Sequence, residues 1–373
     1  MSLGAFKPSI AVANLRQIAM IEGTAEACLP DLVAALRSFV RFDGFKMSWT
    51  DDRERVRAIW HVSPDMRAGS SSMVLFQDRF YNALEKQAVV ATSALLKTPF
   101  KVDNCARYGA AFFDTELYDA ILKPLGFKHA LRLALHGGGR PVGFLTLTRG
   151  DDEKPFSTED ERRLLQVQEI LSHAMAKPVE AKQAGEAESP LVPSGDTAML
   201  ICDLNGDLRH LSNDAQQFLN FIFAPDCLVA DLDRPLAAQV RWWLLPLIRQ
   251  LTTPAPSRAN SAPGLYRQTK WGGFSARAYR LTPAEEGGDS LACVTLTRHV
   301  PLPLRLMRLQ PVKALPRREK EVCLLLANGH SVPDIADRLS MSAHTVTGHV
   351  TSLYTRFNVS SRDQLMVLLL TAP

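Results

Sequence analysis

The sequence predicts a multidomain protein in which two α+β units precede an all-α domain of four short helices. Three observations lead to this fold class. The chain has 373 residues, enough for two or three domains with cores of their own. Its upstream part alternates helical periods with paired strand-like runs, whereas the last sixty residues, roughly, carry helical patterns alone. A polar segment rich in proline, glycine and alanine separates the two upstream units.

These patterns set the expected domain boundaries. In order, they are a first α+β unit at residues 1–176, a linker at 177–196, a second α+β unit at 197–300, a linker at 301–312 and the helical domain at 313–373. Strands joined by short hairpins, with helices between them, are typical of antiparallel α+β folds and not of a parallel βαβ sheet.

Apolar spacing in the first unit predicts both helices and strand pairs. Ser157 is placed to cap a helix, with Asp160 three residues further on. The expected elements are a helix at 15–40, strands at 42–50 and 55–61, a helix at 73–96, a hairpin at 130–136 and 142–149, and a helix from 158 to about 175. The amphipathic pattern of this last helix fits a connector between domains or a dimer interface. Packing against the sheet of its own unit is an equal alternative.

The second unit shows the same kind of alternation. Asn205 and Gly206 form the centre of an expected hairpin, because this dipeptide favours a tight turn. The expected elements are strands at 198–203 and 208–211, helices at 214–223 and 235–251, and strands at 273–281 and 291–298.

Composition limits the classes of function. The chain is 46% hydrophobic and 22% charged, and its net charge is only +4, so no global positive field would hold nucleic acid. Six cysteines without a C-x-x-C pair argue against a disulfide framework and a zinc site. We expect a cytoplasmic protein, since the sequence has neither a signal peptide pattern nor a long apolar run.

The last expected helix but one has a clear inner and outer face. Val346, Val350, Leu353 and Phe357 recur at intervals of four, three and four residues and should face the core, and Ser342 should cap the helix. The outer face then presents small and polar side chains, which are Ala343, His344, Thr347, Gly348, Thr351, Ser352 and Thr355. Side chains of this size permit close approach to a groove of DNA.

This segment resembles the LuxR-type helix-turn-helix domain, also called the GerE or NarL-type output domain. The matching residues are Leu315, Arg318, Glu319, Glu321, Val322, Gly329, Ser331, Ile335, Ala336, Leu339, Ser342, Thr345, Val346, His349, Val350, Phe357, Val359, Ser361 and Arg362. The resemblance covers about one sixth of the chain. It implies a transcriptional regulator that binds double-stranded DNA, for which we also expect RNA polymerase as a partner.

The resemblance assigns roles to a set of residues. Thr347, Gly348, Thr351 and Ser352 would face base edges, and Ser342, Thr345, Arg338 and Arg356 would meet phosphates, with His344 beside them. Two departures from the family pattern matter. Thr347 stands where the family usually has lysine, and Thr351 where it often has a basic residue. Pro316 replaces the usual serine or threonine cap before the first helix. The domain has seven basic and five acidic side chains, a net charge of +2. We therefore expect weak binding by one copy and a homodimer on a pseudo-palindrome.

The upstream units resemble two sensor folds. Gly143 to Arg149 followed by Phe156 to Glu161 is similar to the end of a GAF domain, which would cover residues 15–175. Ala198 to Asp207, Leu211 to Ala215 and Leu291 to Arg298 are similar to parts of a PAS domain. Both resemblances imply a curved sheet around a small-molecule pocket, or a dimerisation unit without a ligand.

Candidate pocket residues come from the aromatic content of the first unit. Trp49, Trp60, Phe76, Phe113 and Tyr118 would line an apolar pocket for a small-molecule effector, and ordinary core packing is the competing explanation. A second hypothesis is redox sensing by Cys105, whose thiolate Lys101 and Arg107 would favour. A third is a scaffold protein whose helical domain only pairs with partners. We find no catalytic or metal-binding constellation, and we expect neither an enzyme nor a cofactor.

Overall fold

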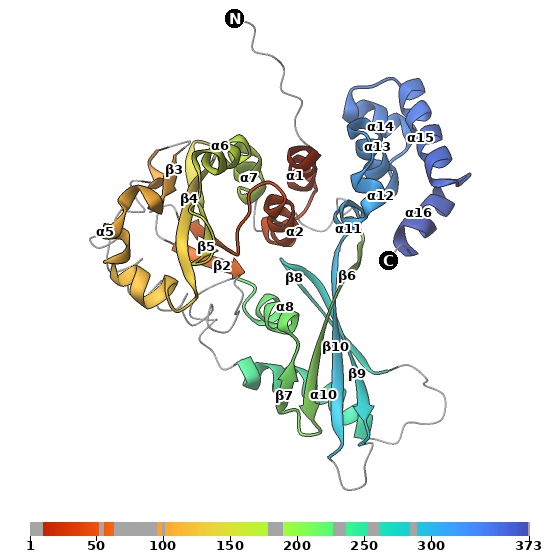
Figure 1. The fold of residues 1–373 in the computed structure, drawn as a ribbon. Helices are drawn as coiled ribbons and strands as arrows, with labels where there is room; N and C mark the ends of the chain where they lie inside the picture. Colours follow the sequence, from red (N-terminus) through yellow and green to blue (C-terminus); the bar gives the residue numbers. More distant parts are fainter. Residues whose placement is uncertain are drawn as a thin grey trace, which may run out of the picture.

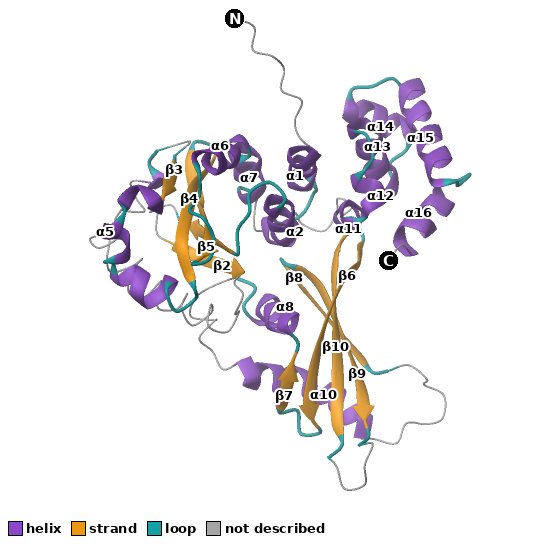
Figure 2. Ribbon diagram, viewed as in Figure 1, coloured by secondary structure: helices purple, strands orange, loops and turns teal. Residues whose placement is uncertain are grey.

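The protein folds as two antiparallel sheets followed by a helical C-terminal domain (Figures 1 and 2). The structure is a computed structural model that describes residues 10–51, 56–62, 95–98, 101–177, 189–226, 236–252, 262–283 and 289–371. Among the helices of these residues, none is long and apolar enough to cross a membrane. The predicted α+β order of the upstream units, followed by an all-α domain, is confirmed at this level.

The first sheet has five antiparallel strands in the order β2-β1-β5-β4-β3. They are β1 (Gly44–Thr50), β2 (Val56–Val62), β3 (Val102–Asn104), β4 (Phe127–Gly137) and β5 (Arg140–Gly150). The predicted hairpin of β4 and β5 is present, with positive φ angles at Gly138 and Gly139. Within the described residues, the helices of this unit are α1 (Ile10–Met20), α2 (Ala25–Arg37), η2 (Cys105–Tyr108), α5 (Ala110–Phe113), η3 (Tyr118–Leu122), α6 (Thr158–Gln166) and α7 (Gln168–Met175).

Two long helices expected in this unit are interrupted. The pattern at 15–40 forms α1 and α2, because Gly23 has a φ of +129° and the Thr24 side chain caps a new helix by accepting from the Ala27 amide. The pattern at 158–175 forms α6 and α7, which meet at Val167. The side chain of Gln168 then donates to the Ala134 carbonyl of β4, so α7 packs on its own sheet. The expected helix at 73–96 falls almost entirely outside the described residues.

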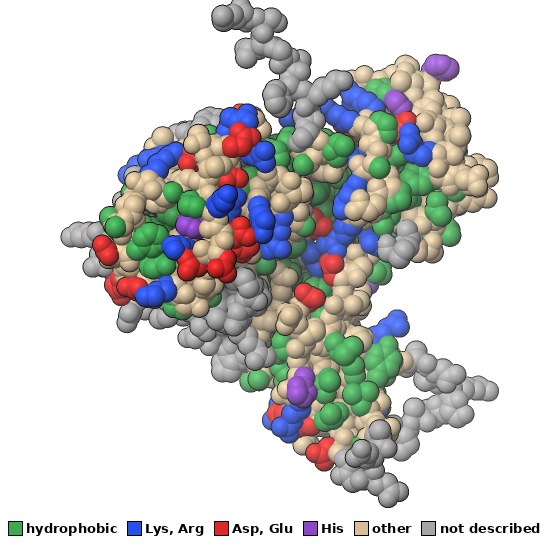
Figure 3. All heavy atoms as spheres, viewed as in Figure 1, with side chains coloured by type: hydrophobic (Ala, Val, Ile, Leu, Met, Phe, Trp, Pro, Cys, Tyr) green, Lys and Arg blue, Asp and Glu red, His purple; other side chains and the backbone are tan. Residues whose placement is uncertain are grey.

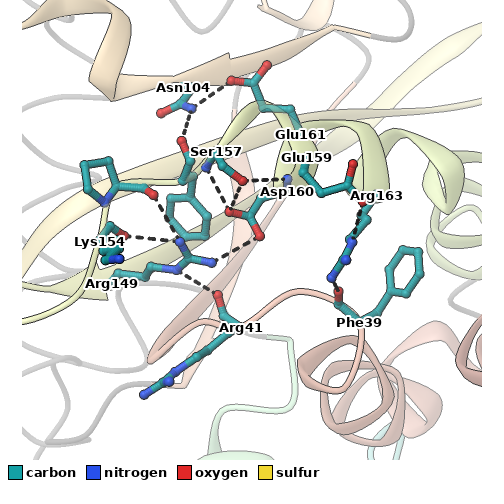
Figure 4. A network of polar contacts seen from close by, with 12 residues as sticks. Phe39, Arg41, Asn104, Arg149, Lys154, Ser157, Glu159, Asp160, Glu161 and Arg163 are labelled. Atoms are coloured by element: carbon teal, nitrogen blue, oxygen red, sulfur yellow. Dashed lines mark hydrogen bonds and ion pairs between the residues drawn. The ribbon is translucent and has the colours of Figure 1, made fainter.

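The expected cap of α6 is confirmed and belongs to a larger network (Figure 4). The Ser157 hydroxyl accepts from the Asp160 amide, and the Asp160 carboxylate accepts from the Ser157 amide in return. Arg149 of β5 donates to the carbonyls of Arg41 and Lys154 and lies 3.3 Å from Asp160. These contacts fasten the start of α6 to the end of the sheet.

The second sheet also has five antiparallel strands, in the order β7-β6-β10-β9-β8. They are β6 (Leu191–Asp203), β7 (Leu208–Leu211), β8 (Gly264–Thr269), β9 (Gly272–Leu281) and β10 (Leu291–Pro301), with helices α8 (Asn213–Phe223) and α10 (Leu236–Thr252). The predicted turn is confirmed, because Gly206 has a φ of +86° and the Asp203 carboxylate accepts from the amides of Asn205 and Asp207. Strand β8 has no counterpart in the sequence analysis.

The two segments expected to be linkers contain regular structure. Strand β6 begins at Leu191, inside the first of them, whose residues 178–188 lie outside the described part. The second is helical and forms α11 (Leu302–Arg308) and α12 (Gln310–Lys313). Leu306, Leu309 and Val312 of this connector are buried in the core of the helical domain. The connector is therefore packed onto the domain that it leads to.

One hydrophobic core runs through both sheet units. The ring centre of Trp60 in β2 lies 6.2 Å from that of Phe221 in α8 and 5.6 Å from that of Trp271. The rings of Phe221 and Trp271 stack with their centres 4.2 Å apart.

The connector also makes polar contacts with both sheet units. Arg308 of α11 donates to both carboxylate oxygens of Asp31 in α2, at 2.6 and 2.9 Å, and pairs with Asp196 of β6. Burial alone would lower the pKa of this guanidinium, but the two carboxylates raise it above its usual range.

Candidate nucleic-acid interface

The C-terminal domain consists of the four predicted helices and a small apolar core. They are α13 (Arg317–Ala327), α14 (Val332–Leu339), α15 (Ala343–Phe357) and α16 (Arg362–Thr371). Val322, Ile335, Val346, Leu353 and Leu365 are fully or almost fully buried at its centre. The inward-facing spacing predicted for α15 holds, with Val350 and Phe357 partly buried against the same core.

Local hydrogen bonds set the turn between α14 and α15. Ser331 and Asp334 form a reciprocal capping box at the start of α14. Ser340 ends that helix with a left-handed φ of +52°, and the Met341 amide donates back to the Ala336 carbonyl. The Ser342 hydroxyl then accepts from the Thr345 amide, which confirms the predicted cap of α15. Short capped helices at a fixed turn form a rigid support for the outer face of α15.

The outer face of α15 carries a run of back-bonded threonines. Thr347, Thr351 and Thr355 each donate their hydroxyl proton to the carbonyl four residues earlier, at 2.9 to 3.0 Å. In this arrangement the threonine oxygens can only accept hydrogen bonds from a base, and their methyl groups are available for apolar contact. A thymine methyl group and the amino groups of adenine and cytosine are the matching features of the major groove.

Gly348 lies between these threonines and is fully exposed to surrounding space. A Cβ atom placed on it would meet no atom within 4 Å. Its φ angle is not in the positive region, so neither the backbone nor the packing of the described residues requires glycine here. Ser342, His344 and Thr345 are also exposed.

Three of the predicted DNA-contacting residues lie against carboxylates of the chain itself. Ser352 is half-buried and donates its hydroxyl to Glu319 Oε1 at 2.9 Å, so it does not lie free on the outer face. Arg356 Nε lies 3.4 Å from the other oxygen of Glu319. Arg338 Nη1 lies 3.7 Å from Glu22, which follows α1 in the first unit.

Other basic side chains of the domain are also engaged. Arg317 and Arg318 both bind the Glu321 carboxylate, at 2.9 and 2.8 Å. Lys320 is 3% exposed, and its ammonium donates to the Asn14 side chain of α1 and to the Lys313 carbonyl. Burial lowers its pKa. Because Lys320 is buried and Arg338 lies beside a carboxylate from outside the domain, the positive charge on its surface is smaller than the net charge of +2 indicates.

The predicted pocket residues are not brought together. Trp49 and Trp60 are buried in the core shared by the two sheet units, whereas Phe113 and Tyr118 pack in a separate cluster around Phe112. Phe76 lies outside the described residues.

Cys105 has an environment opposite to the one expected. Its thiol is buried, 6% exposed, and accepts a hydrogen bond from the Ala130 amide at 3.0 Å. Arg107 pairs with Glu161 instead of the sulfur. Burial raises the pKa of the Cys105 thiol, although the Ala130 bond opposes this, so the protonated form is favoured. The expected net stabilisation of the thiolate by cations is not found, because burial outweighs the lowering effect of Arg132 on the pKa of this thiol.

Sequence reasoning missed Glu22, Glu319 and Asn14, the partners that occupy basic or polar groups of this domain. Glu319 lies on α13, three residues after Pro316. Its contact with α15 depends on how the two helices pack, and the sequence of α13 does not show this. Glu22 and Asn14 are about three hundred residues away in sequence. No local pattern contains that information.

Residues 313–369 match the model of the bacterial regulatory proteins of the luxR family. The C-terminal domain is a LuxR-type helix-turn-helix domain. Curated relatives match this LuxR-type domain, and two of them serve as examples. Oxygen regulatory protein NreC of Staphylococcus epidermidis (strain RP62A) is 39% identical over 56 residues, which are 15% of this chain and 26% of that protein. The putative HTH-type transcriptional regulator YhjB of Escherichia coli is 36% identical over 61 residues, 16% of this chain and 30% of that protein.

These relatives bear on the LuxR-type domain alone, because the chain spans only about a quarter of the length of NreC and under a third of YhjB. Among solved structures, SdiA of Escherichia coli aligns over 96% of this chain and 94% of its own, at 12% identity and a TM-score of 0.31. A similarity with such low identity and TM-score establishes neither the fold nor the function of the upstream units. Their resemblance to GAF and PAS domains stays a prediction.

Proposed function

We propose that this protein is a sequence-specific DNA-binding transcriptional regulator that reads the major groove with α15. The observation that carries this proposal is the outer face of α15 in a LuxR-type domain. Thr347, Gly348 and Thr351 project from it without packing against any other described element. A face of small side chains permits the helix backbone to approach base edges closely.

The proposed active species is a homodimer on a pseudo-palindromic site. Phosphate contacts supply most of the affinity for DNA, and each contact needs a free cation or donor. Arg338 and Arg356 both lie beside carboxylates, and Lys320 is buried. One copy therefore offers few phosphate contacts, and two copies on adjacent half-sites would add their contacts.

Regulation by a small molecule held by the upstream units is the second part of the proposal. The connector α11 is tied to both sheet units through Arg308 and is buried in the core of the LuxR-type domain through Leu306. A ligand that binds one arrangement of these units more tightly than another would increase the population of that arrangement, and α15 would move with it. RNA polymerase is the protein partner expected of such a regulator.

A selection from random DNA duplexes with the full-length protein tests the proposed function. We expect enrichment of a pseudo-palindromic motif by the natural protein. Thr347→Glu should abolish enrichment while leaving the fold intact, because the side chain is exposed and a carboxylate there would repel the phosphates. Failure to enrich any motif would favour the scaffold hypothesis, in which the LuxR-type domain only pairs with partners.

A further inference from the structure

A cavity of about 790 Å³ lies where the two sheet units meet the connector. Its walls come from segments far apart in sequence, namely α1 and α2, β6 and α8, the end of β10, and α11 with α12. Apolar wall residues include Ile18, Phe218, Phe221 and Met307. No residue predicted to line an effector pocket borders it.

Arg298 of β10 borders this cavity and is a buried cation without a carboxylate partner. Its side chain is 1% exposed. Nε donates to the Trp271 carbonyl at 3.1 Å, and Nη2 donates to the carbonyls of Trp271 and Ala27 at 2.9 and 2.8 Å. Nη1 has no hydrogen-bond partner among the described residues, and no carboxylate of those residues lies within ion-pair distance. Burial lowers the pKa of Arg298 to about 10, so it stays charged at neutral pH.

The other charges of the cavity wall are balanced or lie at its rim. Arg308 is held by Asp31 and Asp196. Asp214 is exposed and Lys313 is half-exposed at the edge. Arg298 is therefore the buried charge on this wall that makes no direct ion pair with a described carboxylate. Asp31 and Asp196 act on it only from a longer distance, and its guanidinium lies 5.5 Å from the centre of the Phe221 ring. A buried guanidinium without an opposite charge is costly, and an anion that reaches Nη1 would remove much of that cost.

We propose that this cavity is a binding site for a small molecule that joins an apolar body to a single carboxylate group. The carboxylate accepts from Arg298 Nη1, and the apolar body packs on Phe218, Ile18 and Met307. A single negative charge fits better than a phosphate dianion, because Asp31, Asp196 and Asp214 border the same space and would repel a second charge.

This site deepens the proposed function, on which its regulatory meaning rests. Met307 and Arg308 stand on α11, and Leu306 of the same helix is buried in the LuxR-type domain. A molecule that touches α2, α8 and α11 together would favour the arrangement in which these helices enclose it. Its binding would then bias the position of α15 relative to the sheet units.

The binding test uses phenylacetate and its neutral analogue phenylacetamide as probes on the full-length protein without DNA. Calorimetric titration and thermal unfolding should show that phenylacetate binds and raises Tm. Phenylacetamide should bind about tenfold or more weakly, because it lacks the charge that pairs with the guanidinium.

Three variants test the site. Ala34→Phe should block phenylacetate binding, because Ala34 is exposed on the cavity rim and tolerates a larger side chain. Arg298→Gln should remove the preference for the carboxylate, and Arg277→Gln, an exposed position on the neighbouring strand β9, should keep it.

Three outcomes would overturn the site. They are the absence of binding by either probe, equal binding of both probes, and unchanged phenylacetate binding by Ala34→Phe. DNA binding is measured separately, with and without phenylacetate. Probe binding without any effect on DNA affinity would leave the site standing and remove its regulatory role, whereas absence of DNA binding would overturn the proposed function alone.

Discussion

Gly348 is the residue that most directly indicates an external partner for α15. Glycine inside a helix destabilises it by about 0.5–1 kcal/mol relative to alanine. That cost usually has a structural reason, such as a close neighbour or a positive φ angle. Neither is present at Gly348, where a Cβ would meet only open space. A surface that must come very close to α15 would explain the glycine, and the major groove of DNA is such a surface.

Gly348→Ala should therefore separate stability from function. We expect the free energy of unfolding to rise by about 0.5–1 kcal/mol, because the helix propensity improves without a clash. DNA affinity should fall by about tenfold, since the new methyl group would stand between the helix and the base edges. Urea unfolding and fluorescence anisotropy with a selected duplex measure the two effects. Gln166→Ala, at an exposed position on α6 of the first unit, is the control, and a loss of affinity there as large as that of Gly348→Ala would contradict this role.

Thr347→Lys should strengthen DNA binding in a salt-dependent way. Thr347 is exposed, and its hydroxyl bonds only to its own helix, so a lysine fits without disturbing the core. One added phosphate contact should increase the magnitude of the slope of log affinity against log salt by about one. Titrations at several salt concentrations test this, and an unchanged slope would mean that position 347 does not face the DNA backbone or bases.

Cys105→Ser should leave any response to peroxide unchanged. The buried thiol is held in its protonated form, which reacts slowly with oxidants. DNA binding before and after peroxide treatment, in the natural protein and the variant, tests this expectation. A peroxide response that disappears in Cys105→Ser would restore the redox hypothesis.

Among elements, those defined by local chemistry were predictable. The capping box of α6, the cap of α15, the Asn205 turn and the helices of the LuxR-type domain follow from residues within a few positions of one another. Strand β8 and the helical connector were not predicted, because their pairing and burial depend on distant partners such as β9. Trp60 could be recognised as a large apolar residue, but its stacking on Phe221 required knowledge of how the two units pack.

Ser331→Ala tests the contribution of a cap to the support of α15. The Ser331 hydroxyl accepts from the Asp334 amide and closes the capping box of α14. Its loss should lower the free energy of unfolding of the LuxR-type domain by about 1 kcal/mol. Denaturant unfolding followed by helical circular dichroism measures this. A change below about 0.3 kcal/mol would show that tertiary packing alone holds α14.

At the scale of the whole molecule, α1 and the residues after it lie beside the LuxR-type domain and occupy part of its basic surface (Figure 1). Figure 3 shows basic side chains gathered where the first unit approaches that domain. Buried oxygens and nitrogens of Gln17 and Asn328 line the same contact and have no hydrogen-bond partner among the described residues. Each such group costs about 1–3 kcal/mol, so this contact is weaker than a fully satisfied interface.

Glu22→Gln should release Arg338 for contact with a phosphate. The ion pair is 3.7 Å long and both side chains are more than half exposed, so its loss alters stability very little. We expect DNA affinity to rise by about two- to fivefold, in line with the modest strength of exposed ion pairs. Asp152→Asn changes the net charge equally at an exposed position in the loop between β5 and α6 and should have no such effect. Equal gains in both variants would indicate a general charge effect and not the release of Arg338.

The central claim is that two copies of α15 read a symmetric DNA site. The most direct measurement compares the affinity of the full-length protein for a selected pseudo-palindrome with its affinity for the same duplex after one half-site is scrambled. The account predicts specific binding to the intact site and a loss of about hundredfold or more on the half-site duplex. Equal affinity for both duplexes, or for an unrelated sequence of the same length, would contradict it.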